Sequence, residues 1–148
     1  MTVELNHTIV PARDPRASAA FLAEILGLDA PSRYGPFHVV QVHSGVSLDY
    51  MRADGEVRWQ HYAFIVSEKE FDEILGRIRV RGLAYWADPH HDRPGEINHN
   101  DGGRGVYWAD PDGHNLEIIT RPYAPRADAP TRSFAAQPKV KQKIFLIS

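Results

Sequence analysis

The sequence predicts an α+β domain built from two similar halves. Each half reads as a strand, a helix and then two or three further strands, in the same order. The first half covers about residues 3–52 and the second about residues 57–121. One half cannot bury both faces of its own sheet, which favours packing of the two halves against each other. We therefore predict a single domain over residues 1–122, followed by a loosely held extension over residues 123–148.

The first half begins with a strand-like run over residues 3–10 that contains Val, Ile and Thr. Asp14, followed by a proline, has the pattern of an N-cap and a first helical residue. Gly27 suits the end of that helix. Apolar residues at helical spacing between these points predict one buried face: Ala17, Phe21 and Ile25. Two short strands are then expected over about residues 37–42 and 46–51.

The second half repeats this order from a strand-like run over residues 59–66. Ser67 and Glu70 form a capping-box pattern at the start of a predicted helix, and Gly82 closes it. A turn is predicted over residues 110–113, where the sequence reads Asp-Pro-Asp-Gly. Three short strands are expected in this part of the chain, near residues 83–87, 105–109 and 115–120.

The composition limits the classes of function. The chain has no cysteine, which excludes disulfides and thiolate metal ligands. Its apolar runs are shorter than the roughly 20 residues that span a bilayer, and its first residues lack the pattern of a signal peptide. A formal charge of −2 gives no general attraction for nucleic acid. We therefore expect a cytoplasmic protein with a small-molecule partner and no nucleic acid or membrane partner.

Histidines and carboxylates recur at equivalent places in the two halves. His7 and His61 lie 20 and 21 residues before the glycine that closes each helix, and Asp49 and Glu117 each lie four residues after a turn glycine. Two imidazoles and one carboxylate suit Fe(II), Mn(II), Zn(II) or Ni(II) and leave positions open for substrate. His7, His61 and Glu117 are therefore candidate metal ligands, with Asp49 as a candidate fourth. Hydrogen-bonded core histidines and solvated carboxylates are the alternative interpretation.

Three stretches resemble the vicinal oxygen chelate superfamily: residues 5–10, 59–64 and 105–119. This superfamily includes glyoxalases, extradiol dioxygenases, fosfomycin-resistance enzymes and bleomycin-resistance proteins. The resemblance covers about residues 3–122. It implies paired βαβββ modules that form one curved mixed sheet around a cup, with helices on the outer face. It also implies a metal held by His7, His61 and Glu117.

The stretch from His99 to Glu117 is similar to the extradiol dioxygenases in particular. That resemblance implies that His99 acts as an acid or base near bound oxygen and that Tyr107 donates a hydrogen bond to substrate. It also makes Fe(II) the favoured metal. The intervening loop, residues 88–104, is rich in Gly, Pro, Asp and His and is a candidate lid or site wall.

Two functions of different classes fit these observations. The first is a metal-dependent enzyme that chelates vicinal oxygens of a small, oxygenated substrate, with dioxygenase, lyase or isomerase chemistry. The second is a metal-free binding protein that sequesters an aromatic antibiotic, as bleomycin-resistance relatives do. A homodimer is expected in either case, because a two-module chain leaves sheet edges that a second copy can cover.

Overall fold

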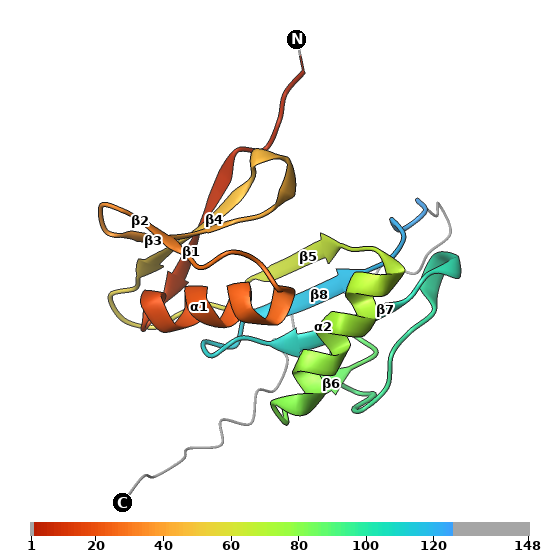
Figure 1. Ribbon diagram of the computed structural model, residues 1–148. Helices are drawn as coiled ribbons and strands as arrows, with labels where there is room; N and C mark the ends of the chain where they lie inside the picture. Colours follow the sequence, from red (N-terminus) through yellow and green to blue (C-terminus); the bar gives the residue numbers. More distant parts are fainter. Residues whose placement is uncertain (1, 126–148) are drawn as a thin grey trace, which may run out of the picture.

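The computed structural model describes residues 2–125, which form two βαβββ modules joined by residues 53–60 (Figure 1). The first module contains β1 (His7–Ala12), α1 (Pro15–Leu26), β2 (Ser32–Tyr34), β3 (Phe37–Gln41) and β4 (Ser47–Arg52). The second contains β5 (His61–Ile65), α2 (Glu68–Val80), β6 (Tyr85–Trp86), β7 (Gly105–Ala109) and β8 (Asn115–Ile119). The predicted repeat of strand, helix and strands is therefore confirmed.

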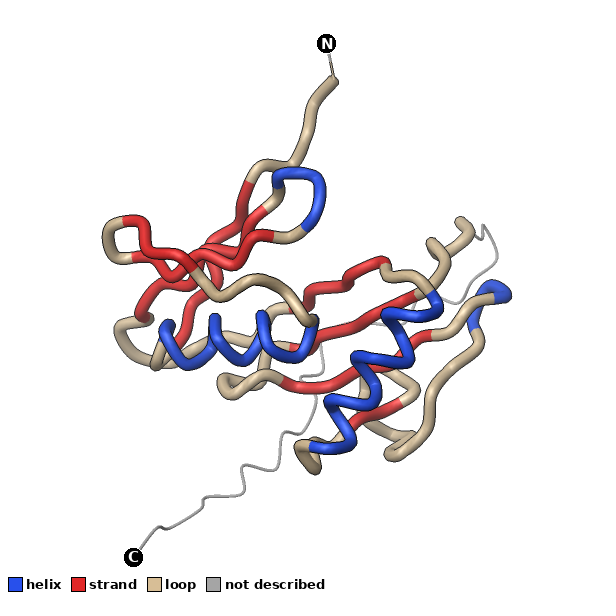
Figure 2. Tube along the Cα trace, in the orientation of Figure 1, coloured by secondary structure: helices blue, strands red, loops and turns tan. Residues whose placement is uncertain are grey.

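Each module has its own four-stranded mixed sheet. The strand orders are β1-β4-β3-β2 and β5-β8-β7-β6, and the first strand of each module pairs in parallel with the last. The sequence led us to expect one curved sheet, but the strands of the two modules form separate groups (Figure 2). β1 and β5 are consequently edge strands, and each leaves one side without a strand partner within the described chain.

The helix boundaries follow the predicted capping residues. Asp14 Oδ1 accepts a hydrogen bond from the Ala17 backbone N–H at 3.0 Å, and the Ser67–Glu70 capping box forms in both directions. Gly27 ends α1 with a φ of +69°, where the Arg77 guanidinium lies about 2.9 Å from where a Cβ would be. Only glycine combines this left-handed backbone with such a close neighbour.

The strand boundaries differ from the sequence-based ones at three places. β1 begins at His7 instead of residue 3, and the exposed residues before it form no strand. β2 has no counterpart in the prediction, because its three residues are all exposed and carry no alternating pattern. β6 has only two residues, since the loop that follows folds back on it at Pro94.

One hydrophobic core connects the modules. The helices pack on the sheet face opposite the predicted ligands and contact each other, with Arg77 Nη1 donating to the Ile25 carbonyl at 3.1 Å. The largest fully buried apolar side chains come from both modules: Tyr50, Phe71, Leu22, Ile25, Ile74, Ile78, Leu116, Ile118 and Trp108. Burial on this scale, at about 25 cal/mol per Å² of apolar surface, is the main term that holds the modules together.

The predicted turn over residues 110–113 fixes the angle between the modules. His114 Nε2 donates to the Pro11 carbonyl of the first module at 2.8 Å, while its Nδ1 accepts the Gln60 backbone N–H at 2.8 Å. Asp112 accepts hydrogen bonds from the Ser18 hydroxyl and the Arg13 backbone, both in the first module. No helix within residues 2–125 is long and apolar enough to cross a membrane.

Candidate metal centre

The strand register places the predicted ligands at equivalent positions of the two sheets. His7 of β1 lies opposite Ser47 of β4, and His61 of β5 lies opposite Asn115 of β8. Two residues further along these partner strands come the carboxylates, Asp49 and Glu117. Since side chains alternate along a strand, all of them lie on the sheet face that points away from the helices. We call this face the site face; it carries His7, Ile9, Asp49 and Met51 in the first sheet and His61, Ala63, Ile65, Tyr107 and Glu117 in the second.

The second module brings an imidazole and a carboxylate into contact. His61 Nε2 lies 3.0 Å from Glu117 Oε2. The Glu117 side chain is 1 % exposed, so it is not the solvated carboxylate of the alternative interpretation. A buried carboxylate is costly unless it is paired, protonated or bound to a cation. In this structure the His61 imidazole is one of its partners.

The ring of His61 is held in a defined orientation. Its Nδ1 donates to the Asn115 backbone carbonyl at 2.9 Å, which leaves Nε2 directed at Glu117. The hydrogen bond to Glu117 raises the pKa of His61, and the bond to Asn115 adds to this effect, while burial opposes it. The contact with Glu117 therefore favours the protonated form of the His61 imidazole.

Two tyrosines complete the surroundings of the carboxylate. The Tyr123 hydroxyl donates a hydrogen bond to Glu117 Oε1, and the Tyr107 hydroxyl lies 3.3 Å from that of Tyr123. The Tyr107 ring stacks on His61 with ring centroids 6.0 Å apart. Burial raises the pKa of Tyr123 to about 12, and burial also raises the pKa of Tyr107. Both phenols are therefore hydrogen-bond donors at neutral pH.

The donor set fits a divalent metal. Two ligand atoms about 2.1 Å from one ion and at right angles to each other lie about 3 Å apart, which is the observed separation of His61 Nε2 and Glu117 Oε2. The bond from Nδ1 to a carbonyl is the usual arrangement of a metal-binding histidine. Within residues 2–125, however, no group of three or more His, Cys, Asp or Glu residues is close enough to hold one ion.

The other predicted site residues lie apart from this pair. His7 is exposed and its Nδ1 contacts Asn6 Oδ1 at 2.7 Å. Asp49 Oδ1 accepts from the Ser47 hydroxyl at 2.8 Å. His99 is exposed, and its side chain makes no hydrogen bond or ion pair with the described residues. The roles predicted for His7, Asp49 and His99 therefore stay predictions.

The loop predicted as a site wall reaches the site through a different histidine. His91, with a left-handed φ of +63°, stacks flat on Trp86 with ring centroids 3.7 Å apart. Its Nε2 donates to Asn115 Oδ1 at 3.0 Å, and Asn115 Nδ2 donates to the Pro89 carbonyl. The loop thus fixes Asn115, whose carbonyl orients His61.

Sequence reasoning missed two of these residues. Tyr123 was assigned to the start of the loosely held extension, and nothing in its local pattern points back to Glu117. The rest of that predicted extension, residues 126–148, lies outside the described residues. Asn115 was placed on the correct face, but its hydrogen bond to His61 uses the backbone carbonyl, which no side-chain pattern reveals.

The chain matches a known family over most of its length. Residues 4–118 match the family model of the Glyoxalase/Bleomycin resistance protein/Dioxygenase superfamily. The chain belongs to this superfamily. The resemblance to vicinal oxygen chelate proteins that the sequence indicated is therefore confirmed.

Several relatives are enzymes. The solved structure "Oxidase ChaP-H1" is 70 % identical with a TM-score of 0.82, covering 84 % of this chain and 100 % of that one. "Oxidase ChaP-H2" is 66 % identical with a TM-score of 0.82, covering 84 % and 98 %. The glutathione transferase FosA of Serratia marcescens is 29 % identical over 135 residues, which are 87 % of this chain and 89 % of that protein. Two of these relatives are named as oxidases and the third as a transferase.

Proposed function

We propose that this protein is a metal-dependent oxidase of a small, oxygenated substrate and that it works as a homodimer. The observation that carries the proposal is the contact of His61 Nε2 with Glu117 Oε2 at 3.0 Å, with Nδ1 already tied to a backbone carbonyl. The oxidase class comes from the relatives that are 70 % and 66 % identical. Sequestration of an antibiotic without turnover is the competing function.

His61 and Glu117 would hold the cation, with Fe(II) favoured over Mn(II), Zn(II) or Ni(II) by the mixed nitrogen and oxygen donors and the oxidase relatives. A divalent cation there supplies Lewis acidity and neutralises charge that develops on vicinal oxygens of the substrate. As a ligand of that cation, His61 would bind through Nε2 as the neutral imidazole, with Nδ1 still donating to the Asn115 carbonyl.

The surrounding residues of this chain orient Glu117 and His61 and supply hydrogen-bond donors. Tyr123 holds Glu117 Oε1, which leaves Oε2 directed toward His61. Tyr107, stacked on His61, donates its hydroxyl proton to Tyr123, and it would donate that proton to a substrate oxygen only by giving up this bond. Asn115 keeps the imidazole from rotating. The loop that carries His91 holds the Asn115 side chain through His91 Nε2 and the Pro89 carbonyl.

The missing third ligand points to a second copy of the chain. His7 occupies in the first sheet the position that His61 occupies in the second, and both lie on open edge strands. Both edge strands have exposed apolar side chains: Leu5, just before β1, is 68 % exposed, and Ile65 of β5 is 62 % exposed. A second copy that sets its β1 beside β5 would cover these side chains and bring its own His7 to the His61–Glu117 pair.

The first test measures metal and turnover together. Anaerobically purified protein is loaded with Fe(II), analysed for bound metal, and assayed for oxygen uptake with a panel of catechols and hydroxyquinones. We expect about one metal per chain and oxygen uptake with at least one compound; His61→Ala should lose both, whereas the exposed control His43→Ala should keep both. Tight binding of an aromatic compound by metal-free protein without turnover would contradict the proposal and favour sequestration.

The second test is complementation between two inactive variants. His7→Ala and His61→Ala are each expected to be inactive. In a mixed dimer one of the two shared sites has both of its histidines, so an equal mixture should regain about a quarter of the wild-type activity. If mixed dimers that contain one chain of each variant form and the mixture stays inactive, a shared site is excluded.

A further inference from the structure

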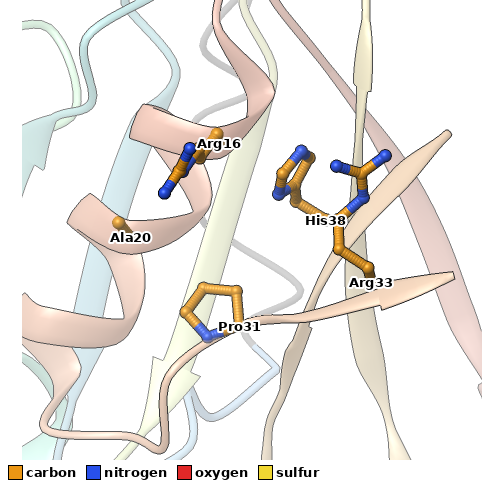
Figure 3. Close-up of a pocket in the computed structure, with 5 residues that line it drawn as sticks. All are labelled: Arg16, Ala20, Pro31, Arg33 and His38. Atoms are coloured by element: carbon orange, nitrogen blue, oxygen red, sulfur yellow. The ribbon is translucent and has the colours of Figure 1, made fainter.

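A cavity lies on the helix-facing side of the first sheet, opposite the site face. It has a volume of about 320 Å³ and lies between α1 and the β2–β3 hairpin. Figure 3 shows the residues that line it: Arg16 and Ala20 on α1, Pro31 before β2, Arg33 on β2 and His38 on β3. Three of these five side chains carry basic nitrogen atoms, and none carries a carboxylate. The lining therefore carries positive charge and no negative charge.

The two guanidinium groups of this cavity are not neutralised. Among the described residues, neither Arg16 nor Arg33 forms an ion pair, whereas Arg104 bonds to both Glu68 and Asp72. Arg33 Nη2 donates to the Gly35 carbonyl at 3.0 Å, which orients the group without cancelling its charge. Arg16 lies in the first turn of α1, where the helix dipole adds positive potential.

His38 takes the place of a core residue. In the strand register His38 lies opposite Tyr50, on the helix-facing side of the first sheet, and its equivalent in the second sheet is Val106, which is fully buried under α2. Burial lowers the pKa of His38, and Arg33 and Arg16 lower it further, against a smaller opposing effect of Asp14. The imidazole is therefore neutral at pH 7 and offers one donor and one acceptor.

We propose that this cavity binds a small oxyanion, the phosphate or carboxylate group of a small molecule, independently of the metal centre. Guanidinium groups bind phosphate and carboxylate through paired N–H donors, and neither arginine has a carboxylate partner among the described residues; Arg33 has N–H donors left besides the one bonded to Gly35. A neutral imidazole supplies a further N–H. The nearest carboxylate that acts on His38, Asp14, caps α1 through Ala17 and is not a lining residue.

The test follows the His38 ring by NMR in the full chain during titration with inorganic phosphate, and separately with acetate, at constant ionic strength set with chloride. His38→Gln identifies the resonance. We expect saturable shifts with phosphate or acetate and an upward shift in the pKa of His38 on binding, because a bound anion favours the imidazolium. The stronger of the two probes identifies the headgroup.

Charge-matched variants separate binding from general screening. The double variant Arg16→Gln/Arg33→Gln should weaken binding at least tenfold, while Arg52→Gln/Arg58→Gln, which removes two exposed arginines outside the cavity, should leave it unchanged. Circular dichroism checks that both fold. Equal binding by the two variants, or shifts that do not saturate with either anion, would overturn the proposal without affecting the metal centre.

Discussion

The two modules have the same strand order and register but use their site faces differently. In the second module the equivalent histidine and carboxylate touch, and two tyrosines surround them. In the first module His7 contacts its neighbour Asn6, and Asp49 contacts Ser47. The same backbone positions therefore hold a preformed pair in one copy and two separate, locally satisfied side chains in the other.

The difference comes from what covers each sheet. Loop 87–104 and residues 121–125 follow strands of the second module, and they supply His91 and Tyr123 to its site face. The first module has no such segments within residues 2–125, so its site face stays open. On the helix side the relation is reversed, since the second module packs Val106 where the first has His38 and a cavity. The repeated fold thus places side chains at equivalent positions, and the segments that lie outside the strands determine what those side chains contact.

The largest difference between the two modules is expected at the two equivalent carboxylates, Glu117 and Asp49. Glu117→Gln should lower Fe(II)-dependent activity about a thousandfold, because it removes an anionic ligand worth several kcal/mol. Asp49→Asn, the matched change in the first module, should alter activity less than twofold. Metal content and oxygen uptake of both variants are the measurements. Equal losses would mean that Asp49 is also a ligand.

The residues at the equivalent helix-facing positions, His38 and Val106, can be exchanged between the modules. Val106→His should lower the free energy of unfolding by about 2–3 kcal/mol, because it places an imidazole without a partner in a closed core. His38→Val should change it by less than about 0.5 kcal/mol, since its site is already partly open. Urea unfolding of both variants measures this. A similar cost for the two changes would show that the modules are equally packed there.

The phenol that the second module gains from residues 121–125 can be removed alone. Tyr123→Phe should weaken metal binding about 10- to 100-fold, as expected for loss of a hydrogen bond to a metal ligand. The exposed Tyr34→Phe in the first module is the control and should have no effect. Competitive metal titration with a chelator gives both affinities. Unchanged affinity in Tyr123→Phe would leave Glu117 oriented by His61 alone.

Asp110 occupies in the second module the position of Val42 in the first. It is expected to add a smaller, pH-dependent term to the free energy of unfolding. Burial raises the pKa of Asp110, and its Oδ2 has no hydrogen-bond partner among the described residues. The folded protein therefore holds this proton more tightly than the unfolded chain. Its contribution to stability is full below the unfolded pKa and is lost as pH rises through the folded pKa.

Asp110→Asn removes that dependence. Relative to wild type, the variant should gain about 1 kcal/mol in free energy of unfolding between pH 4 and pH 7. Urea unfolding at several pH values measures the difference, with Asp54→Asn on the exposed connection as the control. A constant difference across this range would place the ionised carboxylate in a solvated environment.

Local patterns in the sequence determined the elements. The N-caps at Asp14 and Ser67, the glycine at residue 27 and the turn over residues 110–113 act within a few residues of chain, so they could be read without tertiary information. The repeat then placed His7, His61, Asp49 and Glu117 at equivalent positions, which the strand register matches.

Only the tertiary structure decided which of these residues meet. The contact of His61 with Glu117 depends on the pairing of β5 with β8, and the separation of the two sheets depends on how the helices share one core. Tyr123, His91 and the cavity at His38 depend on segments that return across the fold with no periodic signal. Packing of distant segments is set by the sum of many weak contacts, which no local pattern of residues encodes.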